Sequence, residues 1–321
     1  MKVYTNLEDI RQPFPGAHIT IGNFDGVHLG HQKLFELVVS RARQNGGTSV
    51  AVTFDPHPLK VLGDKGIRLI STIEQKIELV ERAGIDVLVI VPFTRAVATT
   101  TAEEFVDRIL LGRFGMRDLV VGYDYAMGKG RRGDTAFLQR QGREKGFSVY
   151  VLPPYHEQGQ LVSSTRIREL VAAGKMRDVR RLLGRCYQIR GVVQEGRQRG
   201  GSLLGYPTAN LALSTEDLCP KRGVYVTQVQ YGGKQYGGVS NIGYNPTFGG
   251  TVLVAETHIF DFSDDIYGKP LKIGLLRHLR GEIRFDGPDA LARQIRRDIE
   301  VARSVLSKEG QKHLIAYQKS A

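Results

Sequence analysis

The chain has 321 residues, of which 41% are hydrophobic and 24% charged, with a net charge of +12; this composition excludes a disordered or fibrous chain. It contains no run approaching the roughly 20 apolar residues of a membrane helix, its start lacks the apolar stretch of a secretory signal, and its two cysteines are too few for a disulfide framework. We therefore expect a cytoplasmic protein of about two domains, with an anionic partner and no membrane partner.

The first half of the chain alternates strand patterns with helical patterns. Five runs are rich in β-branched residues and almost continuously apolar, as strands buried on both faces are: His18–Gly22, Ser49–Phe54, Asp86–Val91, Asp118–Val121 and Ser148–Leu152. Four helical patterns lie between them: Gln32–Gln44, Ile73–Ala83, Glu103–Leu111 and Thr135–Lys145. Capping-box starts occur at Thr101 with Glu104 and at Ser71 with Glu74. This alternation predicts an α/β fold with a doubly wound parallel sheet.

A glycine-rich segment, residues 22–31 (GNFDGVHLGH), follows the first predicted strand and opens the first helix. Its glycines let the backbone approach a ligand closely, and a helix N-terminus offers N–H groups and partial positive charge to phosphate. His28 and His31 can direct both rings at one anionic group. The absence of GxGxxG and P-loop motifs disfavours a dehydrogenase or an ordinary P-loop enzyme. The alternative is a pair of histidines that caps the helix or binds a metal, although two ligands make a weak zinc site.

Three further segments carry polar residues that are candidates for ligand binding. Asp55 and His57 follow the second strand, and Asp124 and Tyr125 follow the fourth. Ligands bind at the carboxyl ends of strands in open α/β sheets, so both loops are candidates for a binding site. The third segment, residues 161–168 (LVSSTRIR), places hydroxyls at a helix start, where they can cap N–H groups or bind phosphate oxygens beside two arginines.

The histidine motif at the first strand–helix turn resembles that of the nucleotidyltransferase superfamily, and residues 161–168 resemble the ISSTxIR signature of that superfamily. The resemblance implies a Rossmann-like domain whose two histidines bind ATP phosphates and stabilise charge as pyrophosphate departs, without a covalent intermediate. The ATP-binding residues that it implies are Gly22, Asn23, Phe24, Asp25, Gly26, His28, Gly30, His31, Ser163, Ser164, Thr165, Arg166 and Arg168. The loops after the second and fourth strands resemble the flavin-side loops of bacterial FAD synthetases, which gives four candidate flavin contacts: Asp55, His57, Asp124 and Tyr125.

After about residue 185 the chain changes to short strand patterns separated by Gly, Pro and Asp. The five runs are Gln188–Val193, Val224–Tyr231, Gln235–Ile242, Ala255–Phe262 and Leu271–Leu279. One helix is predicted near the end, over Asp289–Leu306. The pattern predicts a small antiparallel β-barrel or sandwich with a C-terminal helix. We place the first domain at residues 1–184 and the second at residues 185–321, with two short basic helices before the boundary.

The region around this boundary is strongly basic. Between Ser163 and Gly200, ten basic residues stand against three acidic ones, an excess of seven. Such charge suits a nucleotide or a nucleic acid, and a solvated arginine-rich surface explains it equally well.

The second half carries its own ordered motifs, beginning with residues 205–211 (GYPTANL). Thr208 and Asn210 offer neutral oxygen ligands of the kind that Mg²⁺ accepts. Glu256, on a predicted strand, can serve as a general base; a surface carboxylate is the alternative. The glycines of residues 196–205 suit a flap over phosphates, with Arg197 and Arg199 as candidate contacts.

With residues 241–248 (NIGYNPTF) and 256–262 (ETHIFDF), this set resembles the riboflavin kinase module, a six-stranded barrel. The resemblance implies that Glu256 is catalytic and that Thr208 and Asn210 are metal ligands. The ATP- and flavin-binding residues that it implies are Gly191, Gly205, Pro207, Thr208, Asn210 and Asn241.

Together these motifs identify the chain as a member of the bacterial bifunctional riboflavin kinase/FAD synthetase family. Membership implies phosphorylation of riboflavin to FMN by the second domain and adenylylation of FMN to FAD by the first, with ATP and Mg²⁺ at both sites. We expect a monomer or weak oligomer that binds small nucleotides and flavins and no nucleic acid. Two alternatives remain: a nucleic-acid-binding protein that uses the barrel and the positive charge, and a kinase whose first domain adenylylates another phosphate compound.

Overall fold

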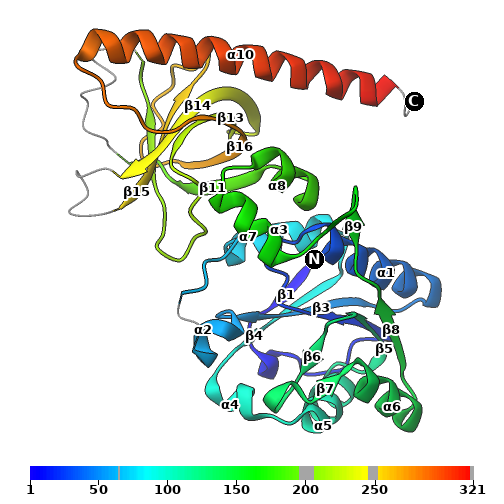
Figure 1. Cartoon of the computed structure of the whole chain (residues 1–321). Helices are drawn as coiled ribbons and strands as arrows, with labels where there is room; N and C mark the ends of the chain where they lie inside the picture. The colour runs from blue at the N-terminus through cyan, green and yellow to red at the C-terminus, as the bar shows by residue number, and fades with distance from the viewer. Residues whose placement is uncertain (64–65, 195–205, 245–251, 319–321) are drawn as a thin grey trace. The chain divides into compact units, whose positions relative to one another are not determined.

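The computed structural model of the chain describes residues 1–63, 66–194, 206–244 and 252–318, with side chains up to residue 308. The chain folds into two compact units, Met1–Arg166 and Ile167–Ala321 (Figure 1). The domain boundary predicted at residues 184 and 185 falls inside the second of these units, and it stays a prediction.

The first unit is built on a six-stranded sheet in the order β1-β4-β3-β2-β5-β8, and every neighbouring pair is parallel (Figure 1). Its strands are β1 (Lys2–Tyr4), β2 (Ala17–Ile21), β3 (Ser49–Asp55), β4 (Val87–Pro92), β5 (Met116–Gly122) and β8 (Ser148–Leu152). All five predicted strands are confirmed. β1 was missed because its three residues are mostly exposed and too few to show a period.

Helices connect the strands of this sheet: α1 (Leu29–Asn45), α2 (Pro58–Leu62), α3 (Ile73–Arg82), α4 (Arg95–Thr99), α5 (Ala102–Glu104) and α6 (Thr135–Lys145). α5 continues into a π-helical segment, η2 (Phe105–Arg113). Shorter elements complete the unit: η1 (Leu7–Asp9), β6 (Ala126–Met127), η3 (Lys129–Arg131), β7 (Gly133–Asp134), β9 (His156–Glu157) and β10 (Gln160–Leu161).

The two predicted capping boxes have different outcomes. The box of Thr101 with Glu104 is confirmed. The prediction at Ser71 is wrong by one residue, since Thr72 caps α3 together with its own partner three positions on. The Ser71 hydroxyl instead accepts a hydrogen bond from the Gly26 amide at 3.0 Å, so a tertiary contact takes the group that the local pattern had assigned to the helix.

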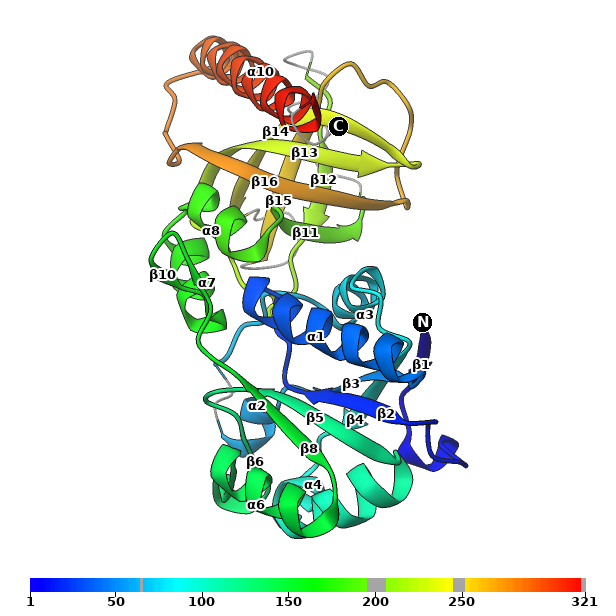
Figure 2. The same ribbon diagram turned by 90° about the vertical axis from the view of Figure 1, so that its right-hand side faces the viewer.

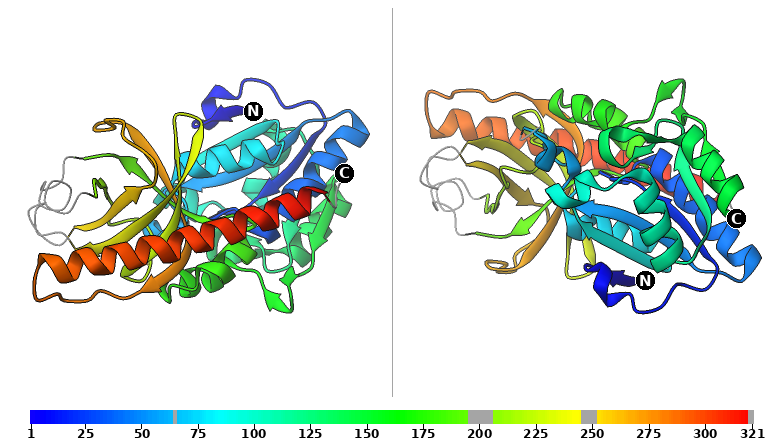
Figure 3. Two further views of the ribbon diagram at one scale, coloured as in Figure 1. Left: turned by 90° about the horizontal axis from the view of Figure 1, so that it is seen from above. Right: turned by 90° about the horizontal axis from the view of Figure 1, so that it is seen from below.

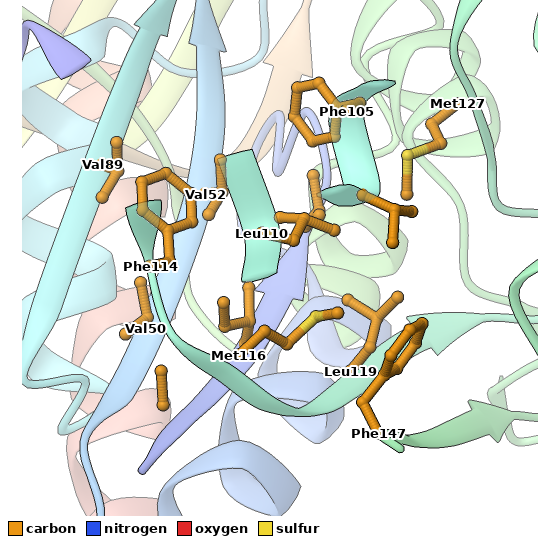
Figure 4. Packing of buried hydrophobic residues seen from close by; sticks show 14 of the residues in the cluster. Val50, Val52, Val89, Phe105, Leu110, Phe114, Met116, Leu119, Met127 and Phe147 are labelled. Atoms are coloured by element: carbon orange, nitrogen blue, oxygen red, sulfur yellow. The ribbon is translucent and has the colours of Figure 1, made fainter. Parts of the chain in front are cut away.

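Each face of the sheet has its own hydrophobic core, because successive side chains of a strand point to opposite faces. Val50 and Val52 of β3 join the core beneath η2 and α6, where Leu110 also packs (Figure 4). Ala51, between them, joins the core with Val38 of α1. Figure 2 shows α1 and α3 on one side of the sheet and α6 on the other. Burial on both faces explains why these strands read as continuous apolar runs.

The second unit contains a nearly closed barrel of six antiparallel strands in the order β11-β16-β13-β14-β15-β12. The strands are β11 (Tyr187–Val192), β12 (Ala209–Ala212), β13 (Gly223–Tyr231), β14 (Lys234–Tyr244), β15 (Leu253–Ile259) and β16 (Pro270–Arg280). The two end strands meet where the Gln194 amide donates to the Asn210 carbonyl oxygen at 2.9 Å. Five strands were predicted, and β12 was missed because it lies inside the segment taken as a ligand loop.

Within the described residues, three helices belong wholly or partly to this unit. The predicted basic helices are present as α7 (Ser164–Ala172) and α8 (Met176–Leu183), and α8 packs on β11 and β16. The predicted terminal helix is α10 (Pro288–Gln318), which runs along the outside of the barrel (Figure 3, orange to red). Its Ala302 packs with Val226 and Leu276 of the barrel. Over the residues that the structure describes, no helix is both long enough and apolar enough to span a bilayer.

Candidate functional site

In the first unit, the chain begins to add strands on the opposite side of the sheet at β2. From β2 the chain passes to β3 and β4 on one side, and it later enters β5 on the other side. In an open α/β sheet, the crevice outside the carboxyl ends of the strands at such a reversal is where ligands bind. The predicted histidine segment follows β2 directly and therefore lies at this position.

The loop between β2 and α1 has a strained backbone. Phe24 and Val27 have positive φ angles of 46° and 39°, and such residues cost about 1–3 kcal/mol each. Gly26 has a φ of 77°, and a Cβ atom there would lie 2.7 Å from the Ile70 side chain. Only glycine fits that position. Strain of this kind persists where the surroundings fix the backbone, and it is typical of functional loops.

The two predicted histidines lie together at the first turn of α1. His28 is the N-cap residue, and its Nδ1 accepts a hydrogen bond from the His31 amide at 3.3 Å. The two rings are stacked, with centroids 3.6 Å apart and planes 17° apart. Gly30 leaves room for this stack, since a Cβ atom there would lie 3.3 Å from the His28 ring. α1 begins at Leu29, three residues before its predicted start, so both imidazoles stand at the positive end of the helix.

The segment at residues 161–168 is joined to this loop. Ser164 Oγ donates to the Asp25 carbonyl oxygen at 3.0 Å, across 139 positions of sequence. Ser163 Oγ accepts from the Arg166 amide at 3.2 Å at the start of α7. The structure thus brings together the two segments that were predicted to bind ATP. The other predicted residues of this segment also lie on α7: Thr165, Arg166 and Arg168.

Two side chains predicted to bind ATP point into the protein instead. Phe24 is 1% exposed, and its ring contacts that of His31 edge to face. Asp25 is 2% exposed, and its carboxylate accepts hydrogen bonds from the amides of Ile70 and Ser71. At these positions the buried side chains support the loop. The exposed Asn23 and the half-buried Gly22 stand at the opening of the loop.

A small pocket opens at the carboxyl end of β3. Its lining combines apolar and polar side chains: Asp25, Phe54, Asp55, His57, Leu69, Ser71, Ile73 and Lys76. The predicted flavin-side residues Asp55 and His57 are both among them. Lys76 was not predicted, yet it is only 7% exposed, and burial lowers the pKa of its ammonium. Its place one turn from Ile73, on the apolar face of α3, is the sequence signal that could have revealed it.

The other two predicted flavin-side residues lie on the loop after β5. Asp124 is exposed, and its carbonyl oxygen accepts from Arg131 Nη2 at 3.1 Å. Tyr125 is half-buried, and burial raises the pKa of its hydroxyl above the ordinary value. Because β3 and β5 are on opposite sides of β2, the two predicted flavin-side loops flank the histidine loop.

In the second unit, three predicted polar residues lie opposite one another on neighbouring strands. Asn210 of β12 pairs with Glu256 of β15, and Glu256 pairs on its other side with Asn241 of β14. Directly opposed residues point to the same face of a sheet. The register therefore forms a row in which two amides flank a half-buried carboxylate, and Asn210 is only 5% exposed.

His258 holds the segment that precedes β12. Its Nδ1 lies 3.0 Å from the Pro207 carbonyl oxygen, and its ring contacts that of Tyr206 edge to face. His258 is two positions beyond Glu256 on β15 and so shares its face of the sheet. Sequence reasoning missed this residue, although its alternate spacing from Glu256 was a usable signal.

The two predicted metal ligands are close together beside this row. Thr208 directly precedes β12, and Asn210 Nδ2 donates to the Thr208 carbonyl oxygen at 3.5 Å. Among the described residues, no group of three or more His, Cys, Asp or Glu side chains is placed to hold a metal ion. Gly191 faces Leu211 of β12, where a Cβ atom would make an ordinary contact at 3.5 Å.

Some predicted residues lie outside the described part of the chain. They are Gly205, together with Arg197 and Arg199 of the predicted flap, and residues 245–248 of the motif that begins at Asn241.

Two family models match this chain. One, described as FAD synthetase, matches residues 11–166, and the other, described as riboflavin kinase, matches residues 183–306.

Relatives and a solved structure match nearly the whole chain. A protein of Escherichia coli (strain K12), named bifunctional riboflavin kinase/FMN adenylyltransferase, is 34% identical, with 94% of this chain and 97% of the relative covered. A protein of Pseudomonas fluorescens with the same name is 35% identical, with 95% and 98% covered. A crystal structure from Streptococcus pneumoniae, titled a macrolide-efflux protein, matches at 32% identity with a TM-score of 0.85, covering 94% of this chain and 98% of its own.

Proposed function

The chain belongs to the family of bifunctional riboflavin kinase/FMN adenylyltransferases, and from that premise we propose which of its residues carry each reaction. It transfers a phosphoryl group from ATP to riboflavin, giving FMN, and an adenylyl group from a second ATP to FMN, giving FAD and pyrophosphate. We assign the adenylyl transfer to the histidine pair of the first unit and the phosphoryl transfer to the row around Glu256.

In the adenylyl transfer, a phosphate oxygen of FMN attacks the α-phosphorus of ATP, and the bond to the bridging oxygen of pyrophosphate breaks. Negative charge builds on the departing pyrophosphate, so catalysis depends on positioning and on positive charge near it. His28 and His31 supply such groups at the positive end of α1. Because His28 Nδ1 accepts from the His31 amide, a neutral His28 ring carries its proton on Nε2 and donates from there.

The observation that carries this proposal is the stacked histidine pair at the N-terminus of α1, beside the reversal in strand order. These donors are fixed before the reaction begins, and preorganised donors stabilise developing charge without reorganisation. The bond from Ser164 to Asp25 supports the assignment, because it holds the second ATP segment against the same loop. Arg166 and Arg168 add charge-assisted contacts to the triphosphate in this proposal.

In the phosphoryl transfer, Glu256 accepts the proton of the ribityl 5′-hydroxyl of riboflavin as that oxygen attacks the γ-phosphorus of ATP. The bond between the γ-phosphorus and the β,γ-bridging oxygen breaks, and ADP leaves. Asn210 and Asn241 flank the carboxylate and orient it through their place in the register. His258 holds Pro207 through the contact of its Nδ1 with the Pro207 carbonyl oxygen.

The donor set beside Glu256 fits Mg²⁺. Thr208 and Asn210 offer uncharged oxygens, and Mg²⁺ keeps several of its waters and takes few protein ligands. When bound, the cation neutralises charge on the phosphates of ATP. The same cation is proposed to accompany ATP at the first site.

We further propose a cytoplasmic monomer or weak oligomer with a domain boundary at residues 184 and 185. The match of the riboflavin kinase model from residue 183 supports this boundary.

The test is to incubate the protein with riboflavin, ATP and Mg²⁺ and to separate the flavins by chromatography. The double variant His28→Ala/His31→Ala should accumulate FMN, with FAD formation reduced by about 10²-fold or more because two charge-stabilising donors are lost. Phosphorylation of riboflavin in the same preparation is the control for folding. FAD formation at the wild-type rate in the double variant would remove the assignment of the histidines.

A further inference from the structure

Lys76 is a buried cation that neither proposed reaction uses. It lies on α3, and its Nζ donates to Thr53 Oγ1 at 3.3 Å. That hydroxyl donates in turn to the Asn23 carbonyl oxygen at 3.1 Å, in the loop before α1. Within the described residues this is the one hydrogen bond of the Lys76 ammonium, and no carboxylate there comes within 4.0 Å of it.

Burial of such a group destabilises a folded protein. An ammonium has three N–H donors, and burying it with one neutral partner leaves most of its lost hydration uncompensated. Burial lowers the pKa of Lys76, while the more distant Asp25 and Asp55 act in the opposite direction. A perturbed cation that lines a pocket is typical of a binding site.

The pocket around Lys76 favours an uncharged ligand group over a phosphate. A phosphate there would meet the carboxylates of Asp25 and Asp55 for a single ammonium. An uncharged acceptor atom at the edge of a flat ring would instead enter beside apolar side chains such as Phe54 and Ile73 and accept from the ammonium.

We propose that the Lys76 ammonium donates a hydrogen bond to an uncharged acceptor, a carbonyl oxygen or ring nitrogen, of the isoalloxazine ring of FMN. The inference rests on the proposed function, which places the flavin beside Asp55 and His57. Lys76 is then a residue that determines specificity for the acceptor substrate, and it contributes to binding FMN and not ATP.

The first test compares Lys76→Met with wild type in the conversion of supplied FMN to FAD. Methionine keeps much of the side-chain length and removes the charge. The KM for FMN should rise by about tenfold to a hundredfold, the loss expected for a hydrogen bond to a charged group. The KM for ATP should stay within about twofold, because the Thr53 hydroxyl keeps its own hydrogen bond to the Asn23 carbonyl oxygen when Lys76 is replaced. Lys76→Arg should recover part of the affinity for FMN, and riboflavin phosphorylation should be unchanged in both variants.

Thr53→Val is the matched control, because it removes the hydroxyl that links Lys76 to Asn23 while keeping the ammonium. If Lys76 acts only by holding the Asn23 loop, Thr53→Val will reproduce the effect of Lys76→Met, and the KM for ATP will rise in both. That result overturns the proposal. A KM for FMN that rises in Lys76→Met and not in Thr53→Val supports it.

Flavin analogues give a second readout that loss of folding cannot imitate. FMN analogues with one ring acceptor altered (1-deaza, 5-deaza, 2-thio and 4-thio) should include at least one that wild type uses about tenfold or more poorly than FMN. Lys76→Met should use that analogue and FMN about equally well. If Lys76→Met keeps the wild-type preference across all four analogues, the proposal is wrong.

Asp55→Asn and His57→Ala separate this inference from the proposed location of the flavin. If neither variant changes the KM for FMN, the location is wrong and the assignment of Lys76 falls with it. If both raise the KM for FMN and Lys76→Met does not, the location stands and the inference about Lys76 alone is overturned.

Discussion

The two candidate sites are built in different ways. In the first unit the site stands on loops at the ends of parallel strands, with backbone strain at Phe24 and Val27 and hydrogen bonds from distant segments. In the second unit the strand register itself aligns the central residues around Glu256. A loop-built site depends on a few tertiary contacts, whereas a register-built site depends on the whole sheet. Substitutions at supporting positions should therefore separate the two activities.

The largest expected effect tests the register-built site. Glu256→Gln keeps the shape of the side chain and its place in the row but removes the general base. We expect riboflavin phosphorylation to fall by about 10²- to 10⁴-fold, measured by chromatography of FMN. FAD formation from supplied FMN should remain at the wild-type level, which controls for folding. Phosphorylation within tenfold of wild type would contradict the role of Glu256.

A glycine substitution tests the loop-built site. In Gly26→Ala, the new Cβ atom would lie 2.7 Å from Ile70 and displace the loop. Misplacement of about 1 Å can reduce a rate by about 10²-fold, so FAD formation should fall by about 10- to 10²-fold, measured with supplied FMN. Gly46→Ala is the matched control, because Gly46 also has a positive φ, 62°, with nothing within 4 Å of its Cβ position. Equal losses in the two variants would show that backbone strain, and not the loop contact, is responsible.

A smaller effect on ATP binding is expected at the contact between the two segments predicted to bind ATP, the histidine loop and residues 161–168. Ser164→Ala removes the hydrogen bond to the Asp25 carbonyl oxygen. A bond of this kind contributes about 0.5–1.5 kcal/mol, so the KM for ATP in FAD formation should rise by about two- to tenfold. Ser40→Ala, at an exposed position of α1, is the control. An unchanged KM for ATP would mean that the contact does not hold the nucleotide segment in place.

The smallest effect concerns stability. Burial lowers the folded-state pKa of Lys76 below its ordinary value of 10.5. At a pH between the folded-state pKa and 10.5, the unfolded chain binds more protons than the folded chain, so the free energy of unfolding of wild type rises with pH. Lys76→Met has no such group. The variant should be more stable at pH 7, by on the order of 1 kcal/mol, and the difference should narrow as the pH approaches 10.5. Urea unfolding at about pH 7 and about pH 10 measures this, and a constant difference would contradict the buried charge.

Much of the fold could be predicted because it depends on local patterns. Strands buried on both faces, such as β3, have continuous apolar sequences, and the helices between them carry caps and amphipathic periods. The predictions from sequence were wrong where tertiary contacts determine the local structure. Ser71 has the spacing of a helix cap, but its hydroxyl bonds to Gly26, and Thr72 caps the helix instead.

The sequence predicted which residues form the candidate site, but not how their side chains are arranged. The sequence places His28 and His31 at one turn, but not the stacking of their rings or the burial of the Phe24 side chain. The opposition of Asn210 and Glu256 depends on strand register, which no local spacing contains. Lys76 was missed because a lysine on a helix is usually solvated.

The barrel has a seam beside one of its proposed metal ligands. β12 pairs with β15 along four residues, whereas on its other side the described residues show a single bridge, from Gln194 to Asn210. Because the described residues hold this seam by one backbone hydrogen bond, the amides of β12 should exchange with solvent sooner than those of the central strands. A nucleotide held at Asn210 would slow that exchange, because ligand binding favours the closed form of the barrel over the opened one.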